Sequence, residues 1–395
     1  MEPGERFLRP RRGVFSIRKG KRFMAKAKMN QTDRMATEYA RRIERLERKV
    51  ARAKLDVLLV VTDINRFYLT GFHSTNAVLA IEPGADPVFF TDFRYLEMAR
   101  KAVKGAKLQM LGGDKDQLAP WAAKRGWKRV GFEGQIPTLR FEALKKSVPD
   151  ATDWVESSQT IVDLRVIKSP VEQNILRRAI HLADDVYAAM LEQVRPGITE
   201  WEVRRILRSL TDNMDAEGES FDCIVGTGPN SSQCHHHVGQ RALKRGEPLL
   251  VDMGVLLDSY HSDMTRTVFL GQPNAKLKEI YKVVLEAQLR AIAKVKAGVK
   301  ASEVDLAARG WIARKGYGEN FGHGLGHGVG LEIHEAPSLA AKSPDILRSG
   351  MVMTIEPGIY LPGVGGVRIE DVVLVKPNGC EVLTRTPKEL IVLDI

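Results

Sequence analysis

Acidic side chains inside otherwise apolar, β-type segments constrain the fold of this chain more than any other feature. Four of them lie in its second half, in segments such as Leu-Leu-Val-Asp-Met and Val-Arg-Ile-Glu-Asp-Val-Val: Asp252, Asp263, Glu356 and Glu370. A buried carboxylate is costly unless a cation or a cage of hydrogen bonds balances it. Each acid taken alone fits a turn cap or an edge position. The whole set predicts a shared polar site in the interior.

Two histidines lie in a segment that contains five glycines, Gly322–Gly330. A spacing of four would place His323 and His327 on one face of a helix, but each glycine costs up to about 1 kcal/mol in a helix interior. In an extended chain both imidazoles share one face and the glycines take the other, so a second backbone can approach closely. The segment is therefore predicted to be extended, with His334 following shortly.

Local geometry predicts how some of these groups meet. A hairpin turn near 258–259 would join the segments of Asp252 and Asp263, so both carboxylates can point to one sheet face. In an extended segment 367–373, Arg368 and Glu370 share a face. An arginine there would orient and charge-balance a set of metal ligands.

One imidazole and four carboxylates form a hard, oxygen-rich donor set. Such a set suits two divalent ions with bridging carboxylates, with Mn²⁺ favoured and Co²⁺, Fe²⁺ or Zn²⁺ as alternatives. An ion pair of this kind holds a bridging hydroxide and polarises a scissile carbonyl. The run Cys234–His237 is not predicted to form a separate metal site, because adjacent side chains cannot all face one ion.

The order of expected elements predicts two domains. Over residues 36–165 short apolar strands, such as 55–61, alternate with helices, which indicates an α/β domain. Residues 65–71 are interpreted as a strand and turn. No Gly-rich phosphate loop occurs in this half. After Ser169-Pro170 two helices precede Gly-rich β segments, which predicts an α+β catalytic domain over residues 166–395.

The charge of the chain is concentrated at its start. Of the net +11, residues 1–28 contribute +8, which leaves about +3 for the body, so no nucleic-acid partner is expected there. Residues 1–35 are predicted to be a disordered basic tail. A targeting peptide, a nucleic-acid arm or a later start codon (Met24, Met29 or Met35) are the alternatives. Three cysteines favour a reducing compartment, the cytoplasm, and no apolar run is long enough to cross a membrane.

The motifs around these residues resemble a known family. The order Asp252, Asp263, His327, Glu356, Glu370 is similar to that of the dinuclear metallopeptidases of the pita-bread fold. The motifs that carry the resemblance include Ser-Asp-Met-Thr-Arg-Thr, Ile-Glu-Pro-Gly and the spaced histidines of 322–337. In the first half, Tyr-Leu-Thr-Gly-Phe and Ile-Lys-Ser-Pro resemble a creatinase-type N-terminal domain, which favours aminopeptidase P or prolidase over methionine aminopeptidase.

The resemblance implies roles for individual residues. Asp252 would chelate one metal ion, His327 and Glu356 the other, and Asp263 and Glu370 would bridge them. Glu356 would also carry a proton toward the leaving nitrogen. The remaining implied catalytic residues contact the substrate or hold Asp252 in place: His235, His323, His334 and Arg368. The sequence departs from the family pattern at three places around the substrate pocket. Gln-Cys precedes His235, His237 is an extra histidine, and Phe221 stands in place of Tyr.

The expected activity is metal-dependent hydrolysis of Xaa-Pro bonds in small peptides, by an Xaa-Pro aminopeptidase or dipeptidase. The resemblance also implies a homodimer. Two other functions are weighed against this one: a catalytically inactive binding module on the same fold, and a metal-free amidinohydrolase of the creatinase type. Both classes of relative lack the full ligand set, whereas all five ligand positions are filled here.

Overall fold

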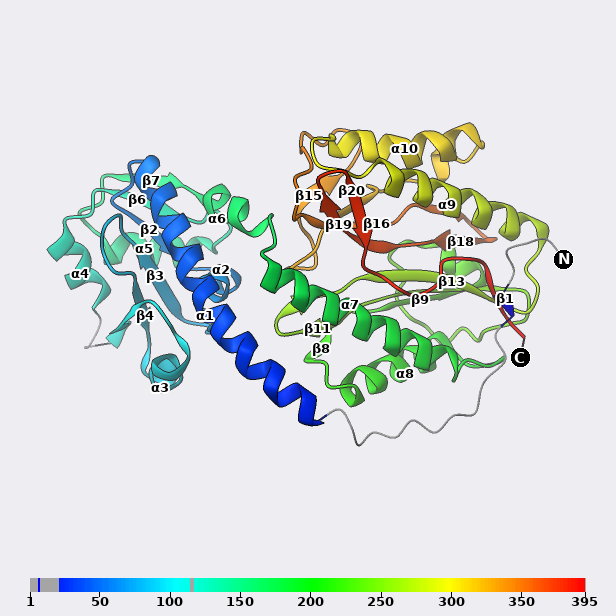
Figure 1. Ribbon diagram of the computed structural model, residues 1–395, viewed down its shortest axis with the longest axis horizontal. Coiled ribbons are helices and arrows are strands. Elements are labelled where there is room, and N and C mark those ends of the chain that lie inside the picture. Colours follow the sequence, from blue (N-terminus) through cyan, green and yellow to red (C-terminus); the bar gives the residue numbers. More distant parts are fainter. Residues whose placement is uncertain (1–5, 8–20, 114–116, 395) are drawn as a thin grey trace. The chain divides into compact units, whose positions relative to one another are not determined.

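The computed structural model describes residues 6–7, 21–113 and 117–394, with side chains from residue 35 onward. It divides after Arg165 into two compact units (Figure 1). In the described part of the first unit a six-stranded mixed sheet has the order β5-β4-β3-β2-β6-β7. Its strands are β2 (Val57–Val60), β3 (Ala77–Ile81), β4 (Val88–Thr91), β5 (Lys107–Met110), β6 (Arg129–Phe132) and β7 (Asp153–Glu156).

Helices surround this sheet, as the alternating sequence pattern predicted. They are α1 (Lys21–Arg52), α2 (Asp63–Thr70), α3 (Phe93–Ala102), α4 (Leu118–Arg125), α5 (Thr138–Ser147) and α6 (Ser158–Arg165). Every residue of the central strands β2, β3 and β4 is buried. Apolar residues on both faces of central strands fit a sheet that is covered on both sides.

One expectation for this unit needs correction. Residues 65–71 are not a strand and turn but belong to helix α2, which ends where Gly71 adopts a left-handed φ of 71°. Its apolar residues recur at helical spacing, and glycine is the residue that best tolerates this C-cap. Residues 1–5 and 8–20 of the expected disordered tail lie outside the described residues. Arg6–Phe7 form strand β1, which pairs with β21 of the second unit, and residues 21–35 form the start of α1.

The second unit is built on several antiparallel pairings. Its described strands are β8 (Gly218–Glu219), β9 (Ile224–Thr227), β10 (Pro248–Met253), β11 (Val255–Leu257), β12 (Tyr260–His261), β13 (Met264–Leu270), β14 (Gly326–Gly328), β15 (Glu335–Leu339), β16 (Val352–Ile355), β17 (Gly358–Leu361), β18 (Gly365–Arg368), β19 (Asp371–Lys376), β20 (Gly379–Val382) and β21 (Ile391–Leu393). Two larger sheets have the orders β1-β21-β13-β10-β9 and β15-β14-β16-β19-β20, and two smaller ones the orders β12-β11-β8 and β17-β18.

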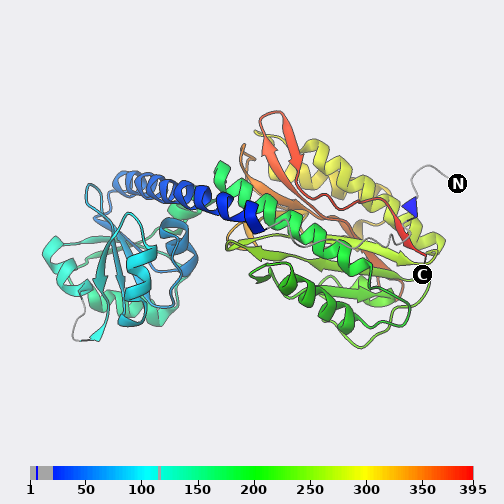
Figure 2. The same ribbon diagram turned by 60° about the horizontal axis from the view of Figure 1, so that its bottom comes forward.

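Two pairs of helices enclose these sheets. Helices α7 (Pro170–Leu191) and α8 (Glu200–Asn213) lie on one side, and α9 (Ala275–Lys294) and α10 (Ala301–Arg314) on the other, as Figures 1 and 2 show. Both α7 and α8 begin with a capping box, formed by Ser169 with Glu172 and by Thr199 with Glu202. Two short 3₁₀ helices, η3 (Gly228–Ser232) and η4 (Gly318–Asn320), lie in the connections.

The strand pairings confirm one local prediction and correct another. The hairpin β11–β12 turns at Asp258 and Ser259, which both have positive φ (49° and 65°), as a two-residue type I′ turn requires. By contrast, residues 367–373 are not one strand. The chain leaves β18 after Arg368 and enters β19, in another sheet, at Asp371. Glu370 lies at this break, where its N–H donates to the Thr265 carbonyl.

Candidate metal centre

The five candidate ligands come from separate segments that end at one cavity of about 680 Å³. Asp252 lies near the end of β10, opposite Thr265 of β13. Asp263 precedes β13, and His327 lies within β14. Glu356 directly follows β16 and Glu370 lies between β18 and β19. Strand pairing brings these donors together, because β10 pairs with β13 and β14 pairs with β16.

Glycines allow the segment of His327 to reach this place. A Cβ on Gly326 would lie 2.2 Å from the Thr354 carbonyl oxygen, and one on Gly328 would lie 2.2 Å from that of Ala336. Both positions therefore require glycine, because the backbones of β14 and its neighbours lie in contact. The predicted close approach of a second backbone to this segment is confirmed.

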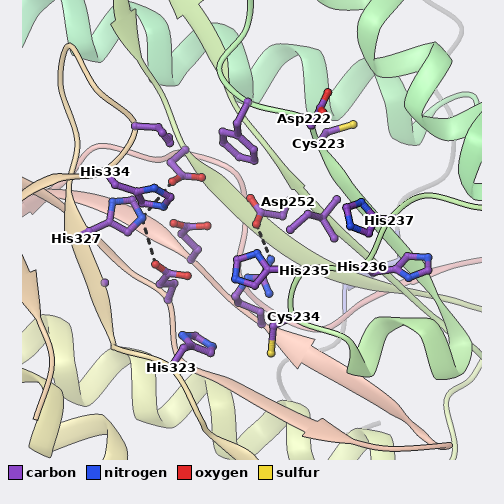
Figure 3. A pocket seen from close by; sticks show the side chains of 18 of the residues that line it. Asp222, Cys223, Cys234, His235, His236, His237, Asp252, His323, His327 and His334 are labelled. Carbon is purple, nitrogen blue, oxygen red and sulfur yellow. Dashed lines mark hydrogen bonds and ion pairs between the residues drawn. The ribbon is translucent and has the colours of Figure 1, made fainter. Parts of the chain in front are cut away.

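Three of the candidate ligands form a compact group. Ligand atoms of Asp263, His327 and Glu370 all lie within 4.8 Å of one another. Glu356 adjoins this group, since its Oε1 lies 3.4 Å from His327 Nε2, while Asp263 Oδ2 lies 3.5 Å from the same nitrogen. Asp252 lines the same cavity (Figure 3). Its carboxylate pairs with the Arg368 guanidinium.

The electrostatics of this cluster fit divalent cations. Burial and repulsion between neighbouring carboxylates raise the pKa of Asp252, Asp263 and Glu370. Within the described chain, Asp252 Oδ1 and Glu370 Oε1 are buried and have no hydrogen-bond partner. Such oxygens are costly unless something else binds them. Divalent ions would satisfy both oxygens and neutralise carboxylates that the Arg368 guanidinium balances only in part.

Arg368 connects the ligands to the surrounding protein. Its Nη2 donates to Asp252 Oδ2 (2.5 Å), its Nε to Thr265 Oγ1 (2.9 Å) and its Nη1 to Tyr360 Oη (3.0 Å). Thr265 Oγ1 in turn donates to Glu370 Oε2 (2.7 Å). The arginine thus orients two candidate ligands, one directly and one through Thr265.

The sequence analysis assigned no role to Thr265 or Tyr360. A signal for Thr265 was available, because it lies two residues after Asp263 and period-2 geometry places the two on one face of a strand. For Tyr360 no local signal exists. Its hydroxyl becomes relevant only because β17 pairs with β18 and so brings it to Arg368.

The three other predicted catalytic histidines line the same cavity: His235, His323 and His334. Burial lowers the pKa of His323 and His334, which keeps both imidazoles neutral at pH 7. His323 Nδ1 donates to the Gly324 carbonyl (2.8 Å), so its Nε2 accepts from Tyr360 Oη (2.9 Å). Both ring nitrogens of His323 are therefore engaged. The ring of His334 lies 4.3 Å from that of His327.

Glu356 differs from the other carboxylates. Although burial opposes ionisation, the hydrogen bond and positive charge of His327 and the charge of Arg368 lower the pKa of Glu356. Its carboxylate is therefore ionised at neutral pH and able to accept a proton.

Fold and site together define a metal-dependent enzyme, with a catalytic unit that holds its ligands at the ends of several strands. Residues 174–377 match the model of metallopeptidase family M24, and residues 42–167 match the creatinase/prolidase N-terminal domain. The chain belongs to this metallopeptidase family. Its architecture is a creatinase-like N-terminal domain followed by a pita-bread catalytic domain, as the sequence analysis predicted.

Individual relatives cover most of the chain. It is 36% identical over 339 residues to an Xaa-Pro dipeptidase of Pyrococcus horikoshii, which covers 85% of this chain and 95% of that protein. The solved structure of an Xaa-Pro dipeptidase from Bacillus anthracis is similar with a TM-score of 0.86 and 40% identity, over 90% of this chain and all of the other. The solved structure of an X-Pro aminopeptidase from Thermotoga maritima is similar with a TM-score of 0.81 and 31% identity, over 87% of this chain and all of the other.

Proposed function

We propose that this chain is a metal-dependent peptidase that hydrolyses Xaa-Pro bonds in small peptides, with Xaa-Pro dipeptides as its main substrates. The observation that carries the proposal is the group of buried carboxylates around His327, with two carboxylate oxygens that lack partners in the described chain. The names of the relatives from Pyrococcus horikoshii and Bacillus anthracis support the substrate class. An Xaa-Pro aminopeptidase is the second candidate, favoured by the likeness to the Thermotoga maritima enzyme.

In this proposal the five donors hold two divalent ions. Asp252 would bind one ion, His327 and Glu356 would bind the other, and Asp263 and Glu370 would be shared between them. The oxygen-rich donor set favours Mn²⁺ among the candidates. When bound, the ions supply Lewis-acid activation of water and of the scissile carbonyl. The short distances between Asp263, His327 and Glu370 support their assignment to one centre.

The other steps fall to the residues of the chain. Glu356, which is ionised at neutral pH, accepts the proton of the attacking water and passes it to the leaving imino nitrogen. His235 and His334 contact the substrate, and the neutral imidazole of His334 can donate one hydrogen bond to a carbonyl or carboxylate oxygen. His323 joins them if its bond to Tyr360 opens. Phe221 and Ile333, which line the cavity, offer apolar surface to a proline ring.

A substrate panel tests this function. Protein loaded with Mn²⁺ is incubated with Xaa-Pro dipeptides, with Xaa-Pro-Xaa tripeptides and with matched peptides that carry alanine in place of proline. We expect the dipeptides to be cleaved fastest, and the Glu356→Gln variant to fold but not to turn over. Faster cleavage of the tripeptides would assign the aminopeptidase function instead. No turnover of either proline-containing class would contradict the proposal.

The assembly and the compartment are proposals too. We propose a homodimer, as the resemblance to the family implies, and a reducing, cytoplasmic environment, supported by cysteines that form no disulfide: Cys223, Cys234 and Cys380. No helix in the described part of the chain is long and apolar enough to cross a membrane. Light scattering of the purified protein checks the dimer, and fractionation of cells checks the compartment.

A further inference from the structure

A buried glutamate at the start of helix α8 has no part in the function described so far. Glu200 is fully buried, and its carboxylate is the acceptor for five hydrogen bonds. The donors are Thr227 N (2.9 Å), Thr227 Oγ1 (3.1 Å), Asn230 Nδ2 (2.9 Å), His236 Nε2 (2.8 Å) and Gly239 N (3.0 Å). Such a saturated carboxylate is a strong structural anchor, because hydrogen bonds to a charged group are the strong ones.

The five donors lie at both ends of one loop. Thr227 and Asn230 belong to its beginning, where β9 runs into η3, and His236 and Gly239 to its end. The backbone adds two further bonds at the exit, since Trp201 N donates to Gly239 O and Glu200 N to Arg241 O, both at 3.0 Å. A single side chain therefore closes the loop that runs from residue 227 to 239.

This loop carries side chains into the cavity of the metal centre. Cys234, His235, His236 and His237 all line it. Figure 3 shows His235 in the part of the pocket where Asp252 lies, and His236 farther from His327. Since His236 directly follows His235 in the chain, the bond from His236 to Glu200 restricts where the His235 imidazole can point.

The energetics make this contact unlike a surface ion pair. The side chain of Glu200 is 0% exposed and that of His236 only 10%. Burial would raise the pKa of Glu200, but its bonds to His236, Thr227 and Asn230 lower it, so the carboxylate is charged. Loss of one donor leaves part of a buried charge unsatisfied, which a loop can relieve only by moving.

We propose that Glu200 and His236 form a clamp that positions His235 for substrate binding. Both are positioning residues, because neither needs to touch the substrate. The proposal rests on the proposed function in that His235 is taken to contact the peptide. It goes beyond that function because the carboxylate of Glu200, at the start of α8, sets the position of His235 through its bond to His236.

Variants of His236 test the clamp. Glu200 itself is not replaced, because it is fully buried and accepts five hydrogen bonds, so its replacement can prevent folding. His236→Ala removes the hydrogen bond from His236 and leaves Glu200 with its other donors. We expect its KM for an Xaa-Pro dipeptide to rise on the order of tenfold with a much smaller change in kcat, the size expected for one hydrogen bond to a charged group. His236→Gln, whose side-chain amide can still donate, is expected to recover most of this loss.

A double-mutant cycle separates positioning from general stability. If His236 acts through His235, then His236→Ala has no further effect on KM in a His235→Ala background. Glu202→Gln is the matched control, since Glu202 lies on the first turn of the same helix and its carboxylate accepts from Thr199, not from the loop. It is expected to lower the melting temperature slightly and to leave KM unchanged. Additive effects of the two histidine variants, or a wild-type KM for His236→Ala, would overturn the clamp.

A second readout does not depend on peptide hydrolysis. In ¹H–¹⁵N spectra of the histidine side chains, His236→Ala is expected to shift or broaden the ring signals of His235, whereas Glu202→Gln leaves them unchanged. Unchanged His235 signals in His236→Ala would refute the clamp even if the enzyme were active. If instead the wild-type protein cleaves no Xaa-Pro peptide while the spectra change as expected, the proposed function fails and the clamp stands.

Discussion

Replacing Arg368 by lysine tests whether the surroundings of the metal centre control its affinity. The guanidinium donates to three partners in different directions: Asp252, Thr265 and Tyr360. A lysine keeps the positive charge but concentrates it on one nitrogen at the end of a flexible chain. We expect it to retain the ion pair with Asp252 and to lose the bonds to the two hydroxyl groups.

The size of the effect follows from these contacts. Two hydrogen bonds from the guanidinium to hydroxyl groups are lost, and each is taken at about 1 kcal/mol, the net value of a typical hydrogen bond in proteins. Without them, Asp252 and, through Thr265, Glu370 are no longer held in the orientation that binds metal. A loss of about 2 kcal/mol corresponds to roughly 30-fold weaker binding. This value lies within the range of about 10–100-fold that is typical when a residue behind the ligands is replaced.

Calorimetric titration of metal-free protein with Mn²⁺ measures this affinity directly. Arg177→Lys is the control, because Arg177 also pairs with a carboxylate, that of Glu381, and does so through two bonds away from the ligands. Circular dichroism confirms that both variants are folded. Wild-type affinity at both sites of Arg368→Lys, or an equal loss in Arg177→Lys, would refute the reasoning that Arg368 orients the ligands.

Four further predictions concern the metal ions, the buried charges and the close backbones. Chelation is expected to abolish peptidase activity. Folding raises the pKa of Asp263 and Glu370 in the metal-free protein, so the folded state binds more protons than the unfolded chain. The stability of the metal-free protein is therefore expected to fall as the pH rises above about 4, the ordinary pKa of a carboxyl group. Melting curves across pH, with and without Mn²⁺, check this. Glu370→Gln is expected to lose both ions in a titration, yet to melt higher than the wild type when both are metal-free at pH 7, because one repelled buried charge is gone; a lower melting temperature contradicts this. Gly326→Ala is expected to cost about 3 kcal/mol or more in urea denaturation, because its Cβ would overlap the Thr354 carbonyl, whereas Gly310→Ala in helix α10 should gain up to about 1 kcal/mol. Similar stabilities for the two glycine variants would argue against close contact at β14.

Much of the fold could be predicted because its signals are local. The turn at 258–259 was predicted from adjacent residues, and the structure confirms it. The capping boxes of α7 and α8 are local in the same way, since each joins residues three positions apart. The segment 65–71 was misread because a short apolar run fits a strand and a helix equally well, and only packing in the tertiary structure distinguishes them. The interruption of 367–373 also had no local signal, since it follows from a change of sheet.

The candidate site was predictable to the extent that its residues are anomalous where they stand. A carboxylate in an apolar segment is conspicuous in any sequence, so Asp252, Asp263 and Glu370 were found. Tyr360, Thr265 and Glu200 were not, because a tyrosine, a threonine and a glutamate at the start of a helix are ordinary residues in such places. Their roles arise from partners that are distant in sequence, as with Thr265 and Glu370, which lie 105 positions apart.

The sequence by itself therefore determined which side chains need a partner in the interior, because the cost of burying a charge is set by the residue and its apolar neighbours. Only the tertiary structure decided which partners meet. Strand pairing brings His327 to Asp263 and Glu370, and helix packing brings Glu200 to His236. Contacts of this kind depend on the path of the whole backbone, and no short stretch of sequence encodes that path.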